Sequence, residues 1–173
     1  MDEKDPLGGK GPQSVKWQAT PAGRVWHAVN ALYRPLWYVR DRHGDDAAED
    51  LLDWMGKELS EELVDMGVKD HFELANWFAN HERQLFGTEV EVDVSEGSST
   101  ITVRNCPRMT CAVEWRERAR GQSSARGISR EEYCRICTKV YLSSPAEGLK
   151  LDHQHELTGS GCVHALNEHI ADG

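Results

Sequence analysis

The stretch TEVEVDVSEGSSTITVRNCP, residues 88–107, decides the fold class of this chain. Over residues 89–94 valine alternates with acidic residues, so an extended chain would carry one apolar face and one polar face. Residues 96–99 (EGSS) are typical of a turn, and residues 100–104 (TITVR) return with β-branched side chains. The stretch therefore predicts a β-hairpin.

Upstream of the hairpin, apolar residues recur at every third or fourth position, which is the period of an amphipathic helix. The first such pattern covers about residues 22–43 and contains Pro35, which should kink or split the helix. A second pattern covers about residues 45–66, and a third covers about residues 69–85. Helices are therefore expected to precede the hairpin.

Downstream of the hairpin, the chain returns to a helix and then to strands. Ser129 followed closely by two glutamates is typical of a capped helix start, and this helix should continue to about Leu142. Residues 149–157 and 162–170 are expected to form a closing pair of strands. This order predicts an α+β fold in which N-terminal helices pack on an antiparallel sheet.

The length and composition predict one domain, which we expect to be cytoplasmic. Residues 21–173 are predicted to form that domain, and the polar residues 1–20 are predicted to be a disordered tail. The N-terminal residues lack the apolar segment of a secretory signal, and no stretch approaches the roughly 18 apolar residues of a membrane span. A net charge of −9 argues against nucleic-acid binding, which needs clustered cationic side chains.

Five cysteines provide the strongest chemical signal. In a reducing cytoplasm, an odd number of cysteines argues against a framework of disulfides. The C-x-x-C pair would place two sulfurs on one face of a helix, and thiolates are ligands that suit zinc or iron. We therefore predict a metal site whose ligands come from Cys106, Cys111, Cys134, Cys137 and Cys162.

Three other interpretations of the cysteines stay open. They could be inert buried thiols, because a free cysteine packs as a small hydrophobe. One of them could be a nucleophilic thiolate whose pKa is lowered by nearby arginines. Cys106, Cys111, Cys134 and Cys137 could also supply four thiolates to an iron–sulfur cluster.

Histidines and arginines could complete the site. His153 and His155 alternate along one expected strand, and His164 follows Cys162 by two positions on the next, so these side chains could share a face. Because histidine titrates near neutral pH, His155 and His164 are the candidates for catalytic acid and base work. A basic segment is either a solvated loop or a clamp for the carboxylate of a small substrate. Its arginines are Arg108, Arg116, Arg118, Arg120, Arg126 and Arg130.

Several short motifs over about residues 22–170 carry a family resemblance. They are His43-Gly44-Asp45 after the first helix, Cys106-Pro107 after the hairpin, Cys134, and Gly159-Ser160-Gly161-Cys162 before the last strand. In this order of features the chain resembles the L-2-amino-thiazoline-4-carboxylic acid hydrolase-like family. It is similar, more distantly, to the 4-vinyl reductase small-molecule-binding domain. Cys111 and Cys137 are additional to the pattern, and His153 and His155 also depart from it.

The resemblance implies an α+β fold, a cysteine-lined site for a small ligand or metal, and hydrolysis of a small cyclic or amide-like substrate. Together with the cysteines, it predicts a metal-dependent hydrolase that acts on a small anionic substrate. The alternatives are a non-catalytic module that binds a small ligand and has a structural Cys–metal site, or an iron–sulfur protein. The sequence is also compatible with a homodimer.

Overall fold

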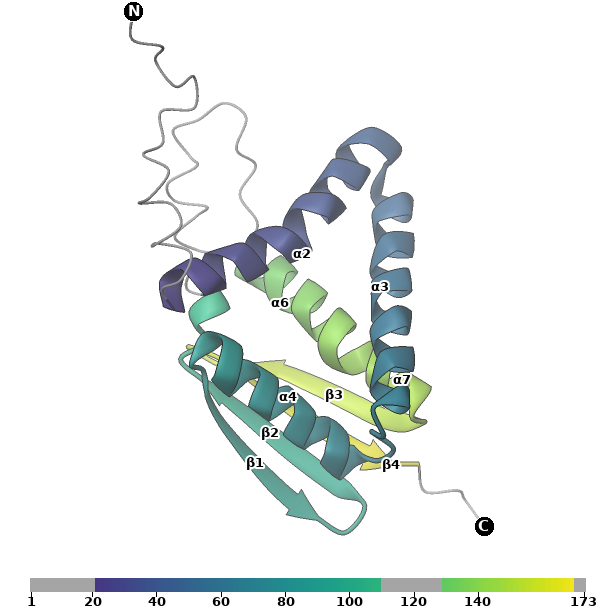
Figure 1. Ribbon diagram of the computed structural model, residues 1–173, viewed down its shortest axis with the longest axis vertical. Helices are drawn as coiled ribbons and strands as arrows, with labels where there is room; N and C mark the ends of the chain where they lie inside the picture. Colours follow the sequence, from purple (N-terminus) through teal and green to yellow (C-terminus); the bar gives the residue numbers. More distant parts are fainter. Residues whose placement is uncertain (1–20, 110–128, 170–173) are drawn as a thin grey trace, which may run out of the picture.

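The fold combines helices with one antiparallel sheet, which confirms the predicted α+β class (Figure 1). A computed structural model describes residues 21–109 and 129–169. The described elements, in chain order, are α2 (Pro21–His43), α3 (Asp45–Asp65), α4 (His71–Phe86), β1 (Glu89–Ser95), β2 (Ser98–Arg104), α6 (Arg130–Thr138), the π-helical turn η1 (Lys139–Ser143), α7 (Ser144–Gly148), β3 (Leu151–Leu157) and β4 (Cys162–Glu168).

The sheet has the strand order β1-β2-β4-β3, and every neighbouring pair is antiparallel. β4 therefore lies between β2, where Val103 pairs with Cys162, and β3, where His155 pairs with His164. Side chains alternate between the two faces of a strand, so Cys162, His164 and Leu166 share one face of β4. Leu166 is completely buried, which identifies this face as the one that the helices cover.

Two apolar clusters hold the helices to the sheet and to one another. In the first, α4 lies over the sheet (Figure 1), and Leu74 of α4 belongs to the same cluster as Ile101 and Leu166 of the sheet. The second cluster joins α2, α3 and α6 and includes Leu52 and Ile136. Each such side chain contributes about 1.5–3 kcal/mol when it is fully removed from water. The apolar periodicity of the helices therefore decides which of their faces turn inward.

Side-chain caps explain where α4 and α6 begin. The carboxylate of Asp70 accepts a hydrogen bond from the backbone N–H of Glu73 at 2.9 Å. The hydroxyl of Ser129 accepts one from the N–H of Glu132 at 3.0 Å, as the sequence predicted. Such a cap satisfies a backbone donor that the first turn of a helix leaves without a partner.

Pro35 does not split the first helix, because α2 is continuous from Pro21 to His43. A proline removes one backbone hydrogen bond and disfavours a helix interior. Here its neighbours Tyr33 and Leu36 are buried in the second apolar cluster, and this burial holds both sides of the proline in the helix.

Some predictions fall on other parts of the chain. The predicted N-terminal tail, residues 1–20, lies outside the described residues, and so do Cys111 and the arginines at 116, 118, 120 and 126.

None of the helices within residues 21–109 and 129–169 combines the length and apolar character needed to cross a membrane.

Gly161 permits a close approach of β2 to the start of β4. A Cβ at this position would lie 1.9 Å from the carbonyl oxygen of Val103, far inside any normal contact. The turn that precedes β4 is also held by hydrogen bonds, because the N–H of Cys106 donates to the carbonyl of Ser160 at 3.0 Å. The guanidinium of Arg130 donates to the carbonyl oxygen of Gly161 at 3.4 Å. The backbone around Gly161 therefore sets the position of Cys162.

Gly161→Ala should destabilise the protein because the new methyl group must displace the backbone of β2. Overpacking of this kind costs about 1–3 kcal/mol, and the melting temperature of a domain of this size falls roughly 2–4 °C per kcal/mol. Gly159→Ala is the matched control, because a Cβ there meets nothing within 4 Å. Thermal unfolding of both variants checks this, and equal melting temperatures would contradict it.

Candidate functional site

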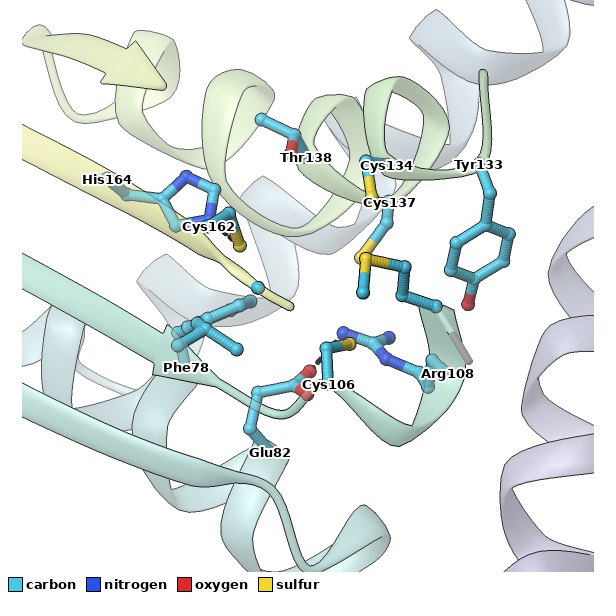
Figure 2. Close-up of a pocket in the computed structure, with 13 residues that line it drawn as sticks. Phe78, Glu82, Cys106, Arg108, Tyr133, Cys134, Cys137, Thr138, Cys162 and His164 are labelled. Atoms are coloured by element: carbon cyan, nitrogen blue, oxygen red, sulfur yellow. Dashed lines mark hydrogen bonds and ion pairs between the residues drawn. The ribbon is translucent and has the colours of Figure 1, made fainter. Parts of the chain in front are cut away.

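Four cysteines from three separate segments line one small cavity, which we call the inner cavity (Figure 2). Cys106 follows β2, Cys134 and Cys137 lie on α6, and Cys162 begins β4. The inner cavity has a volume of about 20 Å³, which is room for one water molecule or one ion. The structure thus brings these four predicted residues together, while Cys111 lies outside the described residues.

Burial favours the protonated form of three thiols in the inner cavity, those of Cys134, Cys137 and Cys162. It raises the pKa of Cys134 to about 11 and the pKa of Cys162 to about 12. Burial also raises the pKa of Cys137, whose side chain faces the same cavity. Because the thiolate is the reactive form, these pKa values argue against a nucleophilic role for the three residues. A metal ion that binds here would have to displace the thiol protons.

A buried ion pair forms one wall of the inner cavity. The guanidinium of Arg108 donates to the carboxylate of Glu82 on α4, and their side chains are 2% and 1% exposed. The guanidinium carbon of Arg108 also lies 4.6 Å from the ring centre of Phe86 and 5.3 Å from that of Tyr141. Arg108 Nε and the hydroxyl of Tyr133 are buried without a hydrogen-bond partner among the described residues.

The interpretation of the basic segment as a solvated loop is therefore wrong for Arg108. The guanidinium of Arg108 is buried, and the carboxylate of Glu82 on α4 compensates its charge there. Arg130 is also engaged, since it donates to the carbonyl oxygen of Thr158 in the turn before β4. The sequence did not single out Glu82, because a glutamate in a helix looks like any solvated acidic residue.

His155, Cys162 and His164 form a compact group of side chains that could hold a metal ion. Their candidate ligand atoms all lie within 4.8 Å of one another, and the described residues contain one such group. His155 on β3 pairs directly with His164 on β4, and Cys162 lies two positions before His164. Cys162 Sγ is 3.1 Å from His164 Nε2. The alternation of β-strand side chains accounts for this grouping.

His153 lies behind His164 as seen from Cys162. Its Nε2 is 3.1 Å from His164 Nδ1, and its Nδ1 is 3.0 Å from the hydroxyl oxygen of Ser143. The rings of His153 and His164 are stacked, with centres 5.4 Å apart and an interplanar angle of 18°. His164 thus has a polar neighbour at each ring nitrogen.

Burial favours the neutral form of His153, His155 and His164. It lowers the pKa of His164 to about 2 and that of His153 to about 4, in both cases with a further contribution from neighbouring histidines. Burial lowers the pKa of His155 as well, although this side chain is exposed to solvent. Neutral imidazole is the form that binds metal ions. His164 is poorly suited to carry protons at neutral pH because it would stay unprotonated.

An open cleft of about 300 Å³ lies beside the group, and we call it the outer cleft. His155 lines the outer cleft, whereas His164 and Cys162 line the inner cavity. The opposite wall comes from α6 and η1 and includes Arg135 and Lys139. The three-residue group therefore has one side in the interior and one side toward solvent.

The structure supports metal binding by this group and does not identify a metal. Assignment of the other cysteines as ligands stays a prediction, and so does the catalytic role of His155 and His164. A pattern could have suggested the group from the sequence, because H-x-H and C-x-H on adjacent strands place their side chains on one face.

No family model matches the chain, and comparisons with curated proteins and with solved structures also give no match. The resemblance to the hydrolase-like family therefore stays a prediction.

Glu82→Gln should strongly destabilise the protein, because it leaves the charge of Arg108 buried without a counter-charge. Removal of one partner from a buried pair costs about 3–5 kcal/mol. Glu91→Gln is the control, since Glu91 pairs with Arg104 at the surface with 67% of its side chain exposed, and such pairs contribute less than about 1 kcal/mol. Urea unfolding measures both, and a loss below about 1 kcal/mol in Glu82→Gln would contradict the role of the pair.

The stability of the metal-free protein should fall as the pH drops from about 6.5 to about 5. The folded-state pKa values of His153 and His164 lie below the ordinary value of 6.5, so the unfolded chain binds protons first. Each group then removes up to about 1.4 kcal/mol per pH unit below 6.5, and above that pH its contribution is constant. Urea unfolding at several pH values checks this, and His164→Gln should reduce the slope. A slope that is the same in this variant would contradict the prediction.

Proposed function

We propose that this chain is a metal-dependent hydrolase in which His155, Cys162 and His164 hold a zinc or iron ion. The observation that carries the proposal is the compact grouping of their ligand atoms, all within 4.8 Å of one another. Two imidazoles and one thiolate are a donor set that suits either metal. The neutral state of both imidazoles, caused by burial, favours ligation further.

The distance between the ligand atoms of Cys162 and His164 is close to that in a tetrahedral site. Typical zinc–sulfur and zinc–nitrogen bonds place two neighbouring ligand atoms about 3.5 Å apart at a tetrahedral angle. Cys162 Sγ and His164 Nε2 are 3.1 Å apart, so a small outward movement suffices. The ring of His155 is nearly parallel to that of His164, at an interplanar angle of 21°. It must turn to direct a nitrogen at the same ion, and its exposure to solvent allows that turn.

Three protein ligands leave one position of a tetrahedral site for water, which is typical of catalytic zinc. An ion held by His155, Cys162 and His164 would supply Lewis-acid activation of water for hydrolysis. The outer cleft, about 300 Å³ in volume, offers room for a small substrate beside His155. We propose a small cyclic or amide-like carboxylate as that substrate, in line with the family resemblance.

Two cationic side chains of the cleft wall could orient such a carboxylate. Arg135 donates to the carboxylate of Glu49 at 2.7 and 3.0 Å, and Lys139 pairs with Asp53. Both pairs join α6 and η1 to α3 and lie near the surface, where exchange with a substrate carboxylate has a small energetic cost. The positive charges of Arg135 and Lys139 support an anionic substrate. The carboxylates of Glu49 and Asp53 offset part of that positive charge and so reduce the net charge of this wall of the cleft.

The small volume of the inner cavity supports a site for a single ion. About 20 Å³ has room for a single ion, which favours a mononuclear centre over an iron–sulfur cluster. A non-catalytic site remains the second candidate, because Cys137 lines the same cavity as Cys162 and could close the coordination sphere. A closed site would have a structural role and would lack a bound water.

Protein purified under reducing conditions should bind about one Co²⁺ or Zn²⁺ ion per chain. With Co²⁺, a thiolate-to-metal absorption band should appear, and Cys162→Ser should abolish it. His164→Ala and His155→Ala should each weaken metal binding by 10-fold or more, since each removes one of three ligands. His169→Ala is the control, because the exposed His169 pairs with Asp152 away from the group. Absence of stoichiometric metal from the wild type would overturn the proposal.

Hydrolysis separates the enzyme from the structural site. The metal-loaded protein should hydrolyse L-2-amino-thiazoline-4-carboxylate or a related cyclic carboxylate, and chelation should abolish that activity. Cys137→Ser should leave the activity intact if water occupies the fourth position. Loss of metal in Cys137→Ser, together with absence of hydrolysis by the wild type, would favour the structural site.

A further inference from the structure

A continuous line of polar contacts joins Cys162 to the outer cleft. Cys162 Sγ lies 3.1 Å from His164 Nε2, and His164 Nδ1 lies 3.1 Å from His153 Nε2. His153 Nδ1 in turn lies 3.0 Å from the hydroxyl oxygen of Ser143. Each imidazole in the line therefore has a partner at both of its nitrogens. Figure 2 shows the beginning of the line, where the ring of His164 lies beside Cys162.

The strand register produces this line. His153 and His155 are two positions apart on β3, so both side chains turn to the face that the helices cover. His155 pairs with His164, and His153 pairs with the next inward residue of β4, Leu166. His153 therefore stands diagonally beside His164, between that ring and Ser143 of the π-helical turn η1.

Ligation by His164 determines where every proton in the line must lie. If Nε2 binds the ion, the remaining proton of the neutral ring must be on Nδ1. That N–H then donates to His153 Nε2, the His153 proton lies on Nδ1, and the second N–H donates to the hydroxyl of Ser143. Each imidazole N–H in this arrangement has an acceptor. The opposite arrangement places a proton on His164 Nε2 and blocks ligation.

We propose that His153 is a positioning residue that holds His164 in the Nδ1–H tautomer and so leaves its Nε2 free for a metal ion. This inference rests on the proposed metal site, of which His164 is a ligand. Metal-binding histidines commonly donate the second N–H to a fixed partner, which orients the ring and selects its tautomer. Here an imidazole takes the place of the usual carboxylate or carbonyl, so the acceptor adds no negative charge to the site.

His153 is better placed for this role than for that of a ligand. Its two nitrogens face Ser143 and His164. It is also not one of the three residues whose candidate ligand atoms all lie within 4.8 Å of one another. His164 is 1% exposed, so water cannot readily replace His153 as the acceptor of its Nδ1–H.

The tautomer can be measured without any metal. In ¹⁵N-labelled metal-free protein, the two-bond ¹⁵N–¹H correlation pattern of the imidazole should identify His164 as the Nδ1–H tautomer. His153→Phe keeps a stacked ring and removes the acceptor, and it should shift His164 toward the Nε2–H tautomer. His153→Gln restores an acceptor oxygen and should restore the Nδ1–H pattern. If His153 acted only through packing, His153→Phe would leave the tautomer of His164 unchanged and His153→Gln would change it.

Metal affinity provides the second measurement. His153→Phe should weaken Co²⁺ binding by roughly 10–100-fold, the usual effect of losing an outer partner of a metal-bound histidine, and His153→Gln should recover most of it. His169→Phe is the matched control and should bind Co²⁺ like the wild type, since its ring is exposed and pairs with Asp152. If the Phe variant does not fold, Ser143→Ala tests the same line from its other end and should weaken binding by a smaller factor.

The outcomes separate this inference from the proposed function. A wild type that binds no Co²⁺ would overturn the proposed function, while the tautomer measurement would still decide the role of His153. A wild type that binds Co²⁺, together with His153→Phe that keeps both the Nδ1–H tautomer and the wild-type affinity, would overturn the inference alone.

Discussion

The pairing of β4 between β2 and β3 is the constraint on which the rest of the structure depends. It closes the sheet from two hairpins that are separated by the whole of α6, η1 and α7. It also turns Cys162 and His164 toward the helices and places His155 opposite His164. The close approach at Gly161 allows this pairing, because a side chain there would collide with the carbonyl of Val103. The same backbone geometry thus completes the core and assembles the candidate site.

The interior beside β4 contains several polar side chains. The ion pair of Arg108 and Glu82, the imidazole of His164 and several thiols occupy volume that apolar side chains would fill more favourably. Polar groups in such positions reduce the stability that a core of the same volume could reach. The proposed metal site would use Cys162 and His164 among them, and the apolar clusters supply the stability that offsets the burial of these polar groups.

Burial acts on the two kinds of candidate ligand in opposite directions. It raises the pKa of Cys162 to about 12 and lowers the pKa of His164 to about 2, because it disfavours the charged form of each. The imidazole is thus already in the form that binds a metal, whereas the thiol must lose a proton when an ion enters. Metal uptake should therefore be accompanied by proton release. The positive charge of the ion would then compensate the negative charge of the Cys162 thiolate.

The sequence by itself determined the local elements and the residue types of the site. Alternating valines specified the hairpin of residues 89–104, the apolar period specified the helices, and Ser129 specified the start of α6. The period of two also placed His153 and His155 on one face of their strand. These features are local, since they depend on residues within a few positions of one another, and the chain displays them before it folds.

Only the tertiary structure decided which of these elements meet. The order β1-β2-β4-β3 depends on pairing between distant segments, and no local pattern specifies that His155 stands opposite His164. Arg108 looked like part of a solvated basic segment, because its counter-charge, Glu82, lies 26 residues earlier on α4. A charged side chain can be buried only when a distant partner and the surrounding apolar residues arrive together. The sequence therefore determined the chemistry available to the site, and long-range packing decided which side chains share it.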